Sequence, residues 1–190
     1  MVALMNVVSA FGLAGAAGLN AYIPLLIVAV LARAEVIRLQ PPFDLLSEWW
    51  AIGILLLLLA VEIVVDKVPG ADHVNDAVQT IIRPTAGAIL FAANSGVITE
   101  ISPALALIVG LMTAGIVHGG KAMARPAVNA STVGIGAPVV SVLEDIVSVV
   151  ASFLAILAPI LFLLFAAVIG YLLYRLVRRW RRARRQNQPA

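Results

Sequence analysis

The chain has 190 residues, of which 62% are hydrophobic and 12% charged, and its mean hydropathy is +1.05. Soluble domains average roughly half apolar and a quarter charged residues, so this composition indicates an integral membrane protein with no room for a soluble catalytic domain. The chain has no cysteine, which excludes disulfides, thiolate metal sites and thiol catalysis.

Apolar runs of span length predict an all-α integral membrane protein, folded as a helical bundle. Spans of about 20 residues with short loops allow about five to seven membrane segments, some of them short, broken or re-entrant. We expect one transmembrane domain at residues 1–177, with halves near 1–95 and 96–177, and a basic tail at 178–190.

The first apolar segment covers residues 1–32. As one helix it would measure roughly 48 Å against a membrane core of about 30 Å, so we expect either a break or a start that lies on the membrane surface. Pro24 is expected to kink or break the segment. Small residues let helices approach closely in lipid. We therefore predict that Gly12, Gly15 and Gly18 face other helices rather than lipid.

A loop punctuated by Pro41 and Pro42 follows at residues 33–50, and the next span is "WAIGILLLLLAVEIVV", which carries Glu62 near its end. After the loop and the span comes "DKVPGADHVNDAVQTIIRPTAGAI", from Asp66 to Ile89. This stretch gathers charge in a chain that is otherwise strongly apolar.

Within it, Asp72, Asp76, Arg83 and Gly87 are spaced 4, 7 and 4 apart, which places them on one face of a helix that starts after Pro69-Gly70. Two readings stay open. The acidic part can lie in water as a loop and an interfacial helix with Asp72 as a cap. Alternatively, these residues face the protein interior and meet charges of the second half, namely Arg125, Glu144 or Asp145.

Residues 84–98 and 103–117 are apolar but only 15 residues long each, which is typical of broken or re-entrant helices that line binding sites. Residues 139–177 are too long for one straight span, so we expect either a break near Pro159 or a strongly tilted helix with Glu144 and Asp145 at the interface. The motif Arg-Pro followed by small residues occurs at Arg83 and again at Arg125. This echo suggests an internal, inverted repeat.

Ionisable groups at membrane depth are costly, so they mark ion pairs or functional sites. Glu144 and Asp145 are adjacent and point to different sides of a helix. We favour an ion pair with Arg83 or Arg125 over the alternative, a proton or cation site. His118 can titrate near neutral pH. His73 and Asp76 are only two metal ligands, and no hydrolase or phosphate-binding motif is present. We expect neither an enzyme nor a metal or cofactor site.

Seven of the thirteen basic residues lie after position 174, while the rest of the chain holds six basic and ten acidic residues. A basic run directly after an apolar segment predicts a cytoplasmic C-terminus. Attraction to anionic lipid headgroups accounts for such a run beside a membrane span, so we expect no nucleic-acid binding.

Three stretches, "GLNAYIPLL", "DKVPGADHVNDAVQTIIRPTAGAIL" and "APVVSVLEDIVSVVASFLAILAP", resemble a widespread bacterial family of multi-spanning membrane proteins classed as domain of unknown function 4126. The resemblance covers nearly the whole chain except the basic tail. It implies a multi-pass architecture and no activity. The residues that it marks are Asp66, Lys67, Pro69, Gly70, Asp72, His73, Asp76, Arg83, Pro84, Ser141, Glu144 and Asp145.

Two functional hypotheses follow. The first is a small transporter or channel for an ion or small solute, a homodimer in the bacterial plasma (inner) membrane, with charged residues on broken helices near the midplane. The second is a non-transporting membrane protein, either a lipid-phosphate binder or a scaffold whose charges form structural ion pairs. A polar, water-accessible cavity distinguishes the two. The candidate binding residues are Asp72, Asp76, Arg83, Arg125, Glu144 and Asp145, and the secondary candidates are Asn20, Glu62, Asp66, His73 and His118.

Overall fold

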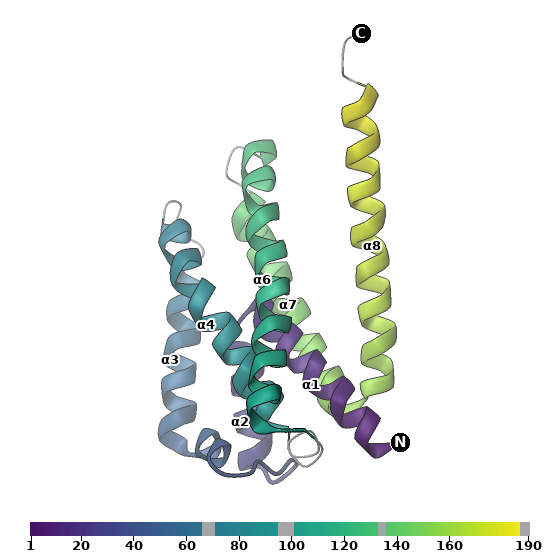
Figure 1. Cartoon of the computed structure of the whole chain (residues 1–190). Helices are drawn as coiled ribbons and strands as arrows, with labels where there is room; N and C mark the ends of the chain where they lie inside the picture. Colours follow the sequence, from purple (N-terminus) through teal and green to yellow (C-terminus); the bar gives the residue numbers. More distant parts are fainter. Residues whose placement is uncertain (66–70, 95–100, 133–135, 187–190) are drawn as a thin grey trace.

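The computed structural model describes residues 1–65, 71–94, 101–132 and 136–186, with the backbone alone at residues 71–76, 127, 129–131, 137 and 180–186. In this part of the chain the regular elements are all helices, packed as a bundle from which the last helix projects (Figure 1). The all-α prediction is therefore confirmed.

Helices α1 (Val2–Leu19) and α2 (Tyr22–Arg33) form a hairpin. Figure 1 shows α1 rising from the N-terminus into the bundle and α2 returning to the same end of the molecule. The two helices line one cavity away from the turn that joins them, with Asn6 and Ser9 contributed by α1 and Val28 by α2. The tip of this hairpin therefore lies inside the bundle, and its open end lies at the surface.

Asn20 makes the break between the two helices. Its backbone is extended, at φ −144° and ψ 125°, and its side-chain Oδ1 accepts hydrogen bonds from the backbone N–H of Tyr22 at 3.0 Å and Ile23 at 3.1 Å. The break was expected at Pro24, but Pro24 lies in the first turn of α2. Early N–H groups have no partner inside their helix, so proline costs little there.

The chain then passes through a 3₁₀ turn, η1 (Phe43–Ser47), into α3 (Trp49–Val65) and α4 (Ala71–Ala93). The predicted loop and the predicted span both occur. Helix α4 is continuous through Pro84, so the prediction that residues 84–98 form a short broken piece is wrong. A proline inside a membrane helix is tolerated where neighbouring groups satisfy the freed backbone carbonyl.

Helix α6 (Pro103–Thr132) is likewise continuous, with Pro126 inside it, and residues 103–117 are its first half rather than a separate short segment. Helices α7 (Gly136–Leu157) and α8 (Pro159–Gln186) meet at Ala158. The predicted break near Pro159 is confirmed. Proline suits the first position of a helix because that N–H has no partner anyway.

The bundle is organised around α1, which packs against α4, α6, α7 and α8, while α4 and α6 form the most extensive pair. Close approach depends on glycine. A Cβ added at Gly12 would lie 2.6 Å from the Cβ of Ala155, and one added at Gly18 would lie 2.6 Å from the Ala114 carbonyl oxygen. The glycine prediction is confirmed for these two positions and wrong for Gly15, where an added Cβ meets nothing within 4 Å.

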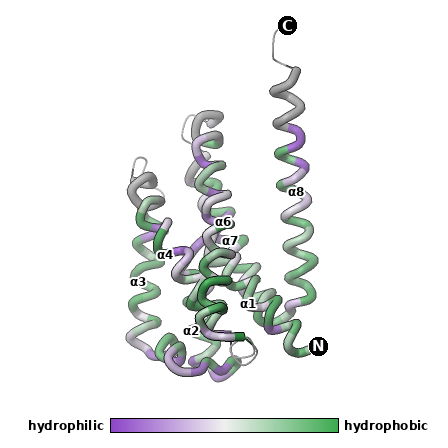
Figure 2. Tube along the Cα trace, in the orientation of Figure 1, coloured by the Kyte–Doolittle hydropathy of each residue, from purple (hydrophilic) through white to green (hydrophobic). Residues whose placement is uncertain are grey.

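The protein is a membrane protein. Among the described residues, four helices are long and apolar enough to cross a membrane: α1, residues 103–126 of α6, residues 138–157 of α7 and residues 159–179 of α8. Figure 2 shows α3 and most of α8 as hydrophobic, with hydrophilic residues in the loop after α2 and toward the end of α8. Many large apolar side chains of α3 and α8 are exposed, which is expected of surfaces that face lipid.

Candidate functional site

Two groups of polar residues, most of them buried, lie in the bundle. We name the first the Arg83 group, made of Glu62, Thr80, Arg83 and His118. We name the second the tip group, made of Asn20, Lys121, Arg125, Glu144 and Asp145, because it surrounds the tip of the α1–α2 hairpin. The two groups adjoin on α6, where His118 is one helical turn from Lys121.

In the Arg83 group, an ion pair joins α4 to α3. The Nη2 atom of Arg83 donates to Oε1 of Glu62 at 2.9 Å, and the two side chains are 0% and 2% exposed. Arg83 was expected to pair with Glu144 or Asp145 of the second half, and that prediction is wrong. Its partner is Glu62, on the neighbouring helix of the first half.

His118 connects this ion pair to α6. Its Nδ1 lies 3.3 Å from Nη1 of Arg83, and its Nε2 lies 3.1 Å from Oγ1 of Thr80. An arginine guanidinium is always a donor, so Nδ1 of His118 is the acceptor. In the neutral imidazole the ring proton then resides on Nε2. The arginine contact is compatible only with neutral His118.

Gln79 and Tyr22 extend the Arg83 group toward the hairpin. Gln79 of α4 is 2% exposed and Tyr22 of α2 is 7% exposed. Among the described atoms, Oε1 of Gln79 and Nε of Arg83 have no hydrogen-bond partner. A buried polar atom without a partner costs about 1–3 kcal/mol and is uncommon enough to mark a site where water or a ligand enters.

The tip group holds its charges around the end of α1. Nζ of Lys121 lies 2.6 Å from Oε2 of Glu144 and donates to the Leu19 carbonyl at 3.1 Å. Nη2 of Arg125 lies 3.7 Å from the same carboxylate oxygen. The last carbonyls of a helix carry partial negative charge, so the lysine also stabilises the end of α1.

Asn20 ties the tip itself to α7. While its Oδ1 caps α2, its Nδ2 donates to Oδ1 of Asp145 at 2.9 Å. One turn further along α7, the hydroxyl of Ser148 donates to the Ala16 carbonyl at 3.1 Å. The last turn of α1 is therefore held by side chains of α6 and α7, and the break exposes its polar groups to charged partners rather than to lipid.

The predicted site residues fall into three sets. Arg83, Arg125, Glu144 and Asp145 are in the two groups, and the predicted pair of Arg125 with Glu144 is present. Three secondary candidates, Asn20, Glu62 and His118, hold central places in the groups. Asp66 lies outside the described residues, and so do the side chains of Asp72, His73 and Asp76.

Sequence reasoning missed Lys121, Gln79, Tyr22 and Ser148. For Lys121 a signal was available, because His118, Lys121 and Arg125 are spaced 3 and 4 apart, which places them on one face of a helix. Gln79, Tyr22 and Ser148 carry no such signal. Among the described residues, no group of three or more histidines, cysteines and carboxylates is arranged to hold a metal ion.

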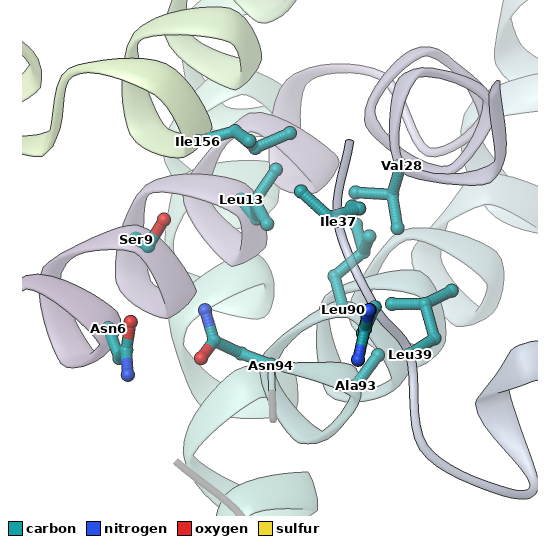
Figure 3. Close-up of a pocket in the computed structure, with 11 residues that line it drawn as sticks. Asn6, Ser9, Leu13, Val28, Ile37, Leu39, Leu90, Ala93, Asn94 and Ile156 are labelled. Carbon is teal, nitrogen blue, oxygen red and sulfur yellow. The ribbon is translucent and has the colours of Figure 1, made fainter. Parts of the chain in front are cut away.

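A cavity of about 240 Å³ opens beneath the hairpin, between its two arms, the segment at residues 37–39 and the end of α4 (Figure 3). Its polar lining consists of Asn6, Ser9, Arg38 and Asn94, and the rest is apolar. Apart from Arg38, no charged residue is among the described ones that line it. The cavity is therefore separate from both polar groups.

Comparison with known proteins adds one relationship. The family model of domain of unknown function DUF4126 matches residues 7–179, which include every residue of the Arg83 group and the tip group. No curated protein and no solved structure matches the chain. Since the matched range covers nearly the whole chain, this protein belongs to the DUF4126 family.

Proposed function

We propose that the protein is a transporter or channel for an ion or small solute, whose path passes the tip of the α1–α2 hairpin. One observation carries the proposal: the hairpin breaks at Asn20, inside the bundle, at the place where the charges of α6 and α7 converge. Broken helices that present their ends to charged groups at membrane depth are typical of transporter binding sites. In this reading α1 and α2 form a re-entrant hairpin.

The energetics support a functional role for these charges. Each ionisable group at membrane depth costs about 2.5–3.5 kcal/mol on insertion scales, and replacing a buried ion pair by apolar residues is often neutral or stabilising. Four charged residues of the two groups are buried, namely Glu62, Arg83, Lys121 and Arg125, and two carboxylates, Glu144 and Asp145, are partly buried. A contribution to the stability of the fold does not by itself account for so many charged residues inside the bundle.

The cavity beneath the hairpin supports an access route. It is lined in part by polar side chains and lies at the end of the molecule opposite the C-terminus (Figures 1 and 3). Leu13, at the cavity wall, lies seven positions before Asn20 in the chain, so the cavity ends about 10 Å short of the tip. A polar, partly open cavity favours transport over a scaffold role.

Between the cavity and the tip group the helices are closely packed, with Gly12 against Ala155 and the Ser148 hydroxyl on the Ala16 carbonyl. The route is closed in this conformation. Transport therefore requires the hairpin to move against α7. The contacts that would break include the packing of Gly12 against Ala155, the hydrogen bond from Ser148 to the Ala16 carbonyl and the hydrogen bond from Asn20 to Asp145.

The second candidate function is that of a scaffold or lipid-phosphate binder. Of the two polar groups, only the Arg83 group supports it. Glu62 and Arg83 form a fully buried pair with a short contact, as a structural ion pair does. We accordingly propose that the Arg83 group holds α3, α4 and α6 in position. The tip group is proposed to bind the transported species.

Three further assignments belong to this proposal. We place the protein in the bacterial plasma membrane with a cytoplasmic C-terminus, because a basic run after an apolar helix is retained on the cytoplasmic side. We propose a homodimer, with the outward apolar surface of α8 as its contact. The activity requires no enzyme chemistry.

The test is flux through purified protein in liposomes, with gradients of H⁺, Na⁺, K⁺, chloride and formate applied in turn. At least one gradient should dissipate faster than in protein-free liposomes. Lys121→Met should slow it by about tenfold or more, since losing 1.4 kcal/mol of stabilisation along the path has that effect. Arg178→Met is the matched control, because Arg178 is exposed on α8.

A wild-type protein that is folded yet passes none of these species would contradict the transport proposal and favour the scaffold. Equal slowing by Lys121→Met and Arg178→Met would remove the tip group from the path.

A further inference from the structure

The cavity beneath the hairpin is an unfilled space lined by four helices and a loop. Leu13 of α1, Val28 of α2, Leu90 of α4 and Ile156 of α7 contribute to its wall, together with residues 37–39 of the loop after α2. Its volume is about 240 Å³. At about 30 Å³ for each water in the liquid, this space suits a ligand of about eight to ten non-hydrogen atoms.

Three of the polar side chains that line this cavity have unused hydrogen-bonding capacity. They are the amides of Asn6 and Asn94 and the guanidinium of Arg38. Within the described part of the chain, none of these three side chains has a hydrogen-bond or ion-pair partner. The fourth polar side chain, the Ser9 hydroxyl, already donates to the Ala155 carbonyl. The two amides and the guanidinium are therefore the groups that a ligand can engage.

These polar groups lie on two sides of an apolar wall. Figure 3 shows Asn6 and Asn94 toward one side of the cavity and Leu39 toward the opposite side, with Leu13 and Ile37 along the wall between them. Arg38 enters the cavity from the segment that carries Leu39. A ligand that fills the space therefore has an apolar body with a polar group at each end.

Arg38 determines the charge of that ligand. Its guanidinium is always protonated and presents a planar fork that matches a carboxylate. Glu35 and Asp44 line a second hollow that shares residues 37–39 with the cavity. Neither carboxylate forms an ion pair with Arg38 in the described part of the chain. The arginine is thus available to an anion, and the two nearby carboxylates favour a singly charged anion over a doubly charged one.

We propose that this cavity binds a small monocarboxylate with an apolar body and a hydroxyl or amide group at the far end. Arg38 binds the carboxylate, the apolar wall covers the body, and the amides of Asn6 and Asn94 bind the far polar group. Para-hydroxybenzoate has this chemistry and size. The inference goes beyond the proposed transport function, because binding in the cavity requires no movement of the hairpin.

The binding is measured by thermal unfolding of the full chain in detergent, with rising para-hydroxybenzoate at constant ionic strength. The Tm should rise in a saturable manner, by about 3 °C or more at ten times the dissociation constant, as for a ligand that binds only the folded state. Benzoate, which lacks the far hydroxyl, should bind about fivefold more weakly. Para-hydroxybenzyl alcohol, which lacks the carboxylate, should bind weaker by about tenfold or more.

Variants assign the binding to this cavity. Arg38→Gln should weaken the binding of para-hydroxybenzoate by about tenfold or more and leave that of the alcohol unchanged. Arg33→Gln is the matched control, because Arg33 lies over the Trp49 ring, 5.0 Å from its centroid, and does not line the cavity. Its affinity should equal that of the parent. Asn94→Ala is a second, independent variant, and it should bind para-hydroxybenzoate no better than benzoate.

Two results would overturn the site. One is the absence of a saturable rise in the Tm of the folded parent with any of the three compounds. The other is equal affinity for para-hydroxybenzoate in the parent and in either cavity variant. Flux in liposomes is independent of this outcome. Ion flux without binding would remove the cavity site and leave transport standing, whereas binding without any flux would leave the site standing and contradict transport.

Discussion

Arg83 is the most completely buried charge in the described part of the chain, and its contacts explain how the bundle accommodates it. The guanidinium donates to Glu62 of α3 and lies against Nδ1 of His118 on α6. Arginine keeps its charge under all conditions, so it cannot escape the cost of burial by losing a proton. Its pairing with Glu62 therefore decides whether three helices fit together.

Removing Arg83 should destabilise the protein strongly. Arg83→Ala leaves Glu62 buried without its cation, an effect of about 3–5 kcal/mol for a buried pair. Arg83→Lys should recover only part of this, since lysine lacks the planar fork that contacts two partners at once. Thermal unfolding in detergent measures both changes. Arg178→Ala, which removes an exposed arginine from α8, should stay within about 0.5 kcal/mol of the parent.

Double variants identify the partner. Combining Arg83→Met with Glu62→Gln should recover stability relative to Arg83→Met alone, because no uncompensated charge remains in that pair. Combining Arg83→Met with Glu144→Gln should not, since Glu144 pairs with Lys121 and Arg125 instead. Recovery in the second combination and not in the first would contradict the pairing.

At the scale of elements, the sequence predicted that residues 1–32 must break and could not place the break. The sequence points to Pro24 as the cause, because proline removes a hydrogen bond in a helix interior. Here Asn20 makes the break, since a short polar side chain can cap the next helix. Whether Asn20 caps or merely lies in a helix depends on Asp145, more than a hundred residues away. Such information is absent from the local sequence.

In helices α4 and α6 the sequence predicted short pieces, whereas the structure has continuous helices. Pro84 begins one of the expected short pieces, yet it lies inside the continuous helix α4, and Pro126 likewise lies inside α6. In a membrane bundle the neighbouring helices can satisfy the freed backbone groups. The cost of a proline inside a helix can be predicted from the local sequence. The neighbouring helices that compensate for this cost cannot.

Close packing of α1 should depend on individual glycines. A Cβ at Gly18 would lie 2.6 Å from the Ala114 carbonyl oxygen and from the Val117 Cβ, whereas one at Gly15 meets nothing within 4 Å. Gly18→Leu should therefore destabilise by about 1–3 kcal/mol through overpacking. Gly15→Leu, three residues away on the same helix, should leave stability unchanged or raise it, because leucine favours helix more than glycine does. Thermal unfolding and the yield of folded protein measure both variants.

The two substitutions are matched in size, helix and chemistry, so their order is the result that matters. If Gly15→Leu proved the more damaging of the two, the packing of α1 against α6 described here would be wrong.

At the scale of the whole molecule, the sequence indicates which ionisable residues would cost free energy inside the membrane. It does not indicate their partners. Spacing places Asp72, Asp76 and Arg83 on one side of a helix, yet it does not say which neighbour that side meets. Arg83 meets Glu62 because α3 and α4 are adjacent in the chain and in space. The spacing of His118, Lys121 and Arg125 places Lys121 on a shared helix face, but only the structure shows that Glu144 is its partner.

The internal repeat stays a prediction. Arg83 and Arg125 each precede a proline, and each is buried beside a glutamate. However, Glu62 lies on the helix before Arg83, and Glu144 lies on the helix after Arg125. The two pairs are therefore alike in chemistry and different in connectivity.

The orientation of the chain in the membrane gives the last prediction. The loop between α2 and α3 lies at the end of the molecule that holds the N-terminus, and the C-terminus lies at the opposite end (Figure 1). The proposed cytoplasmic location of the basic tail predicts that Gln40 of that loop lies on the outer side of the membrane. Because the chain has no cysteine, a single introduced cysteine reports its own side. A membrane-impermeant maleimide should label Gln40→Cys in intact spheroplasts, and it should label Gln188→Cys only after permeabilisation. The reverse pattern would invert the orientation, and equal labelling of both would show that the two ends lie on one side of the membrane.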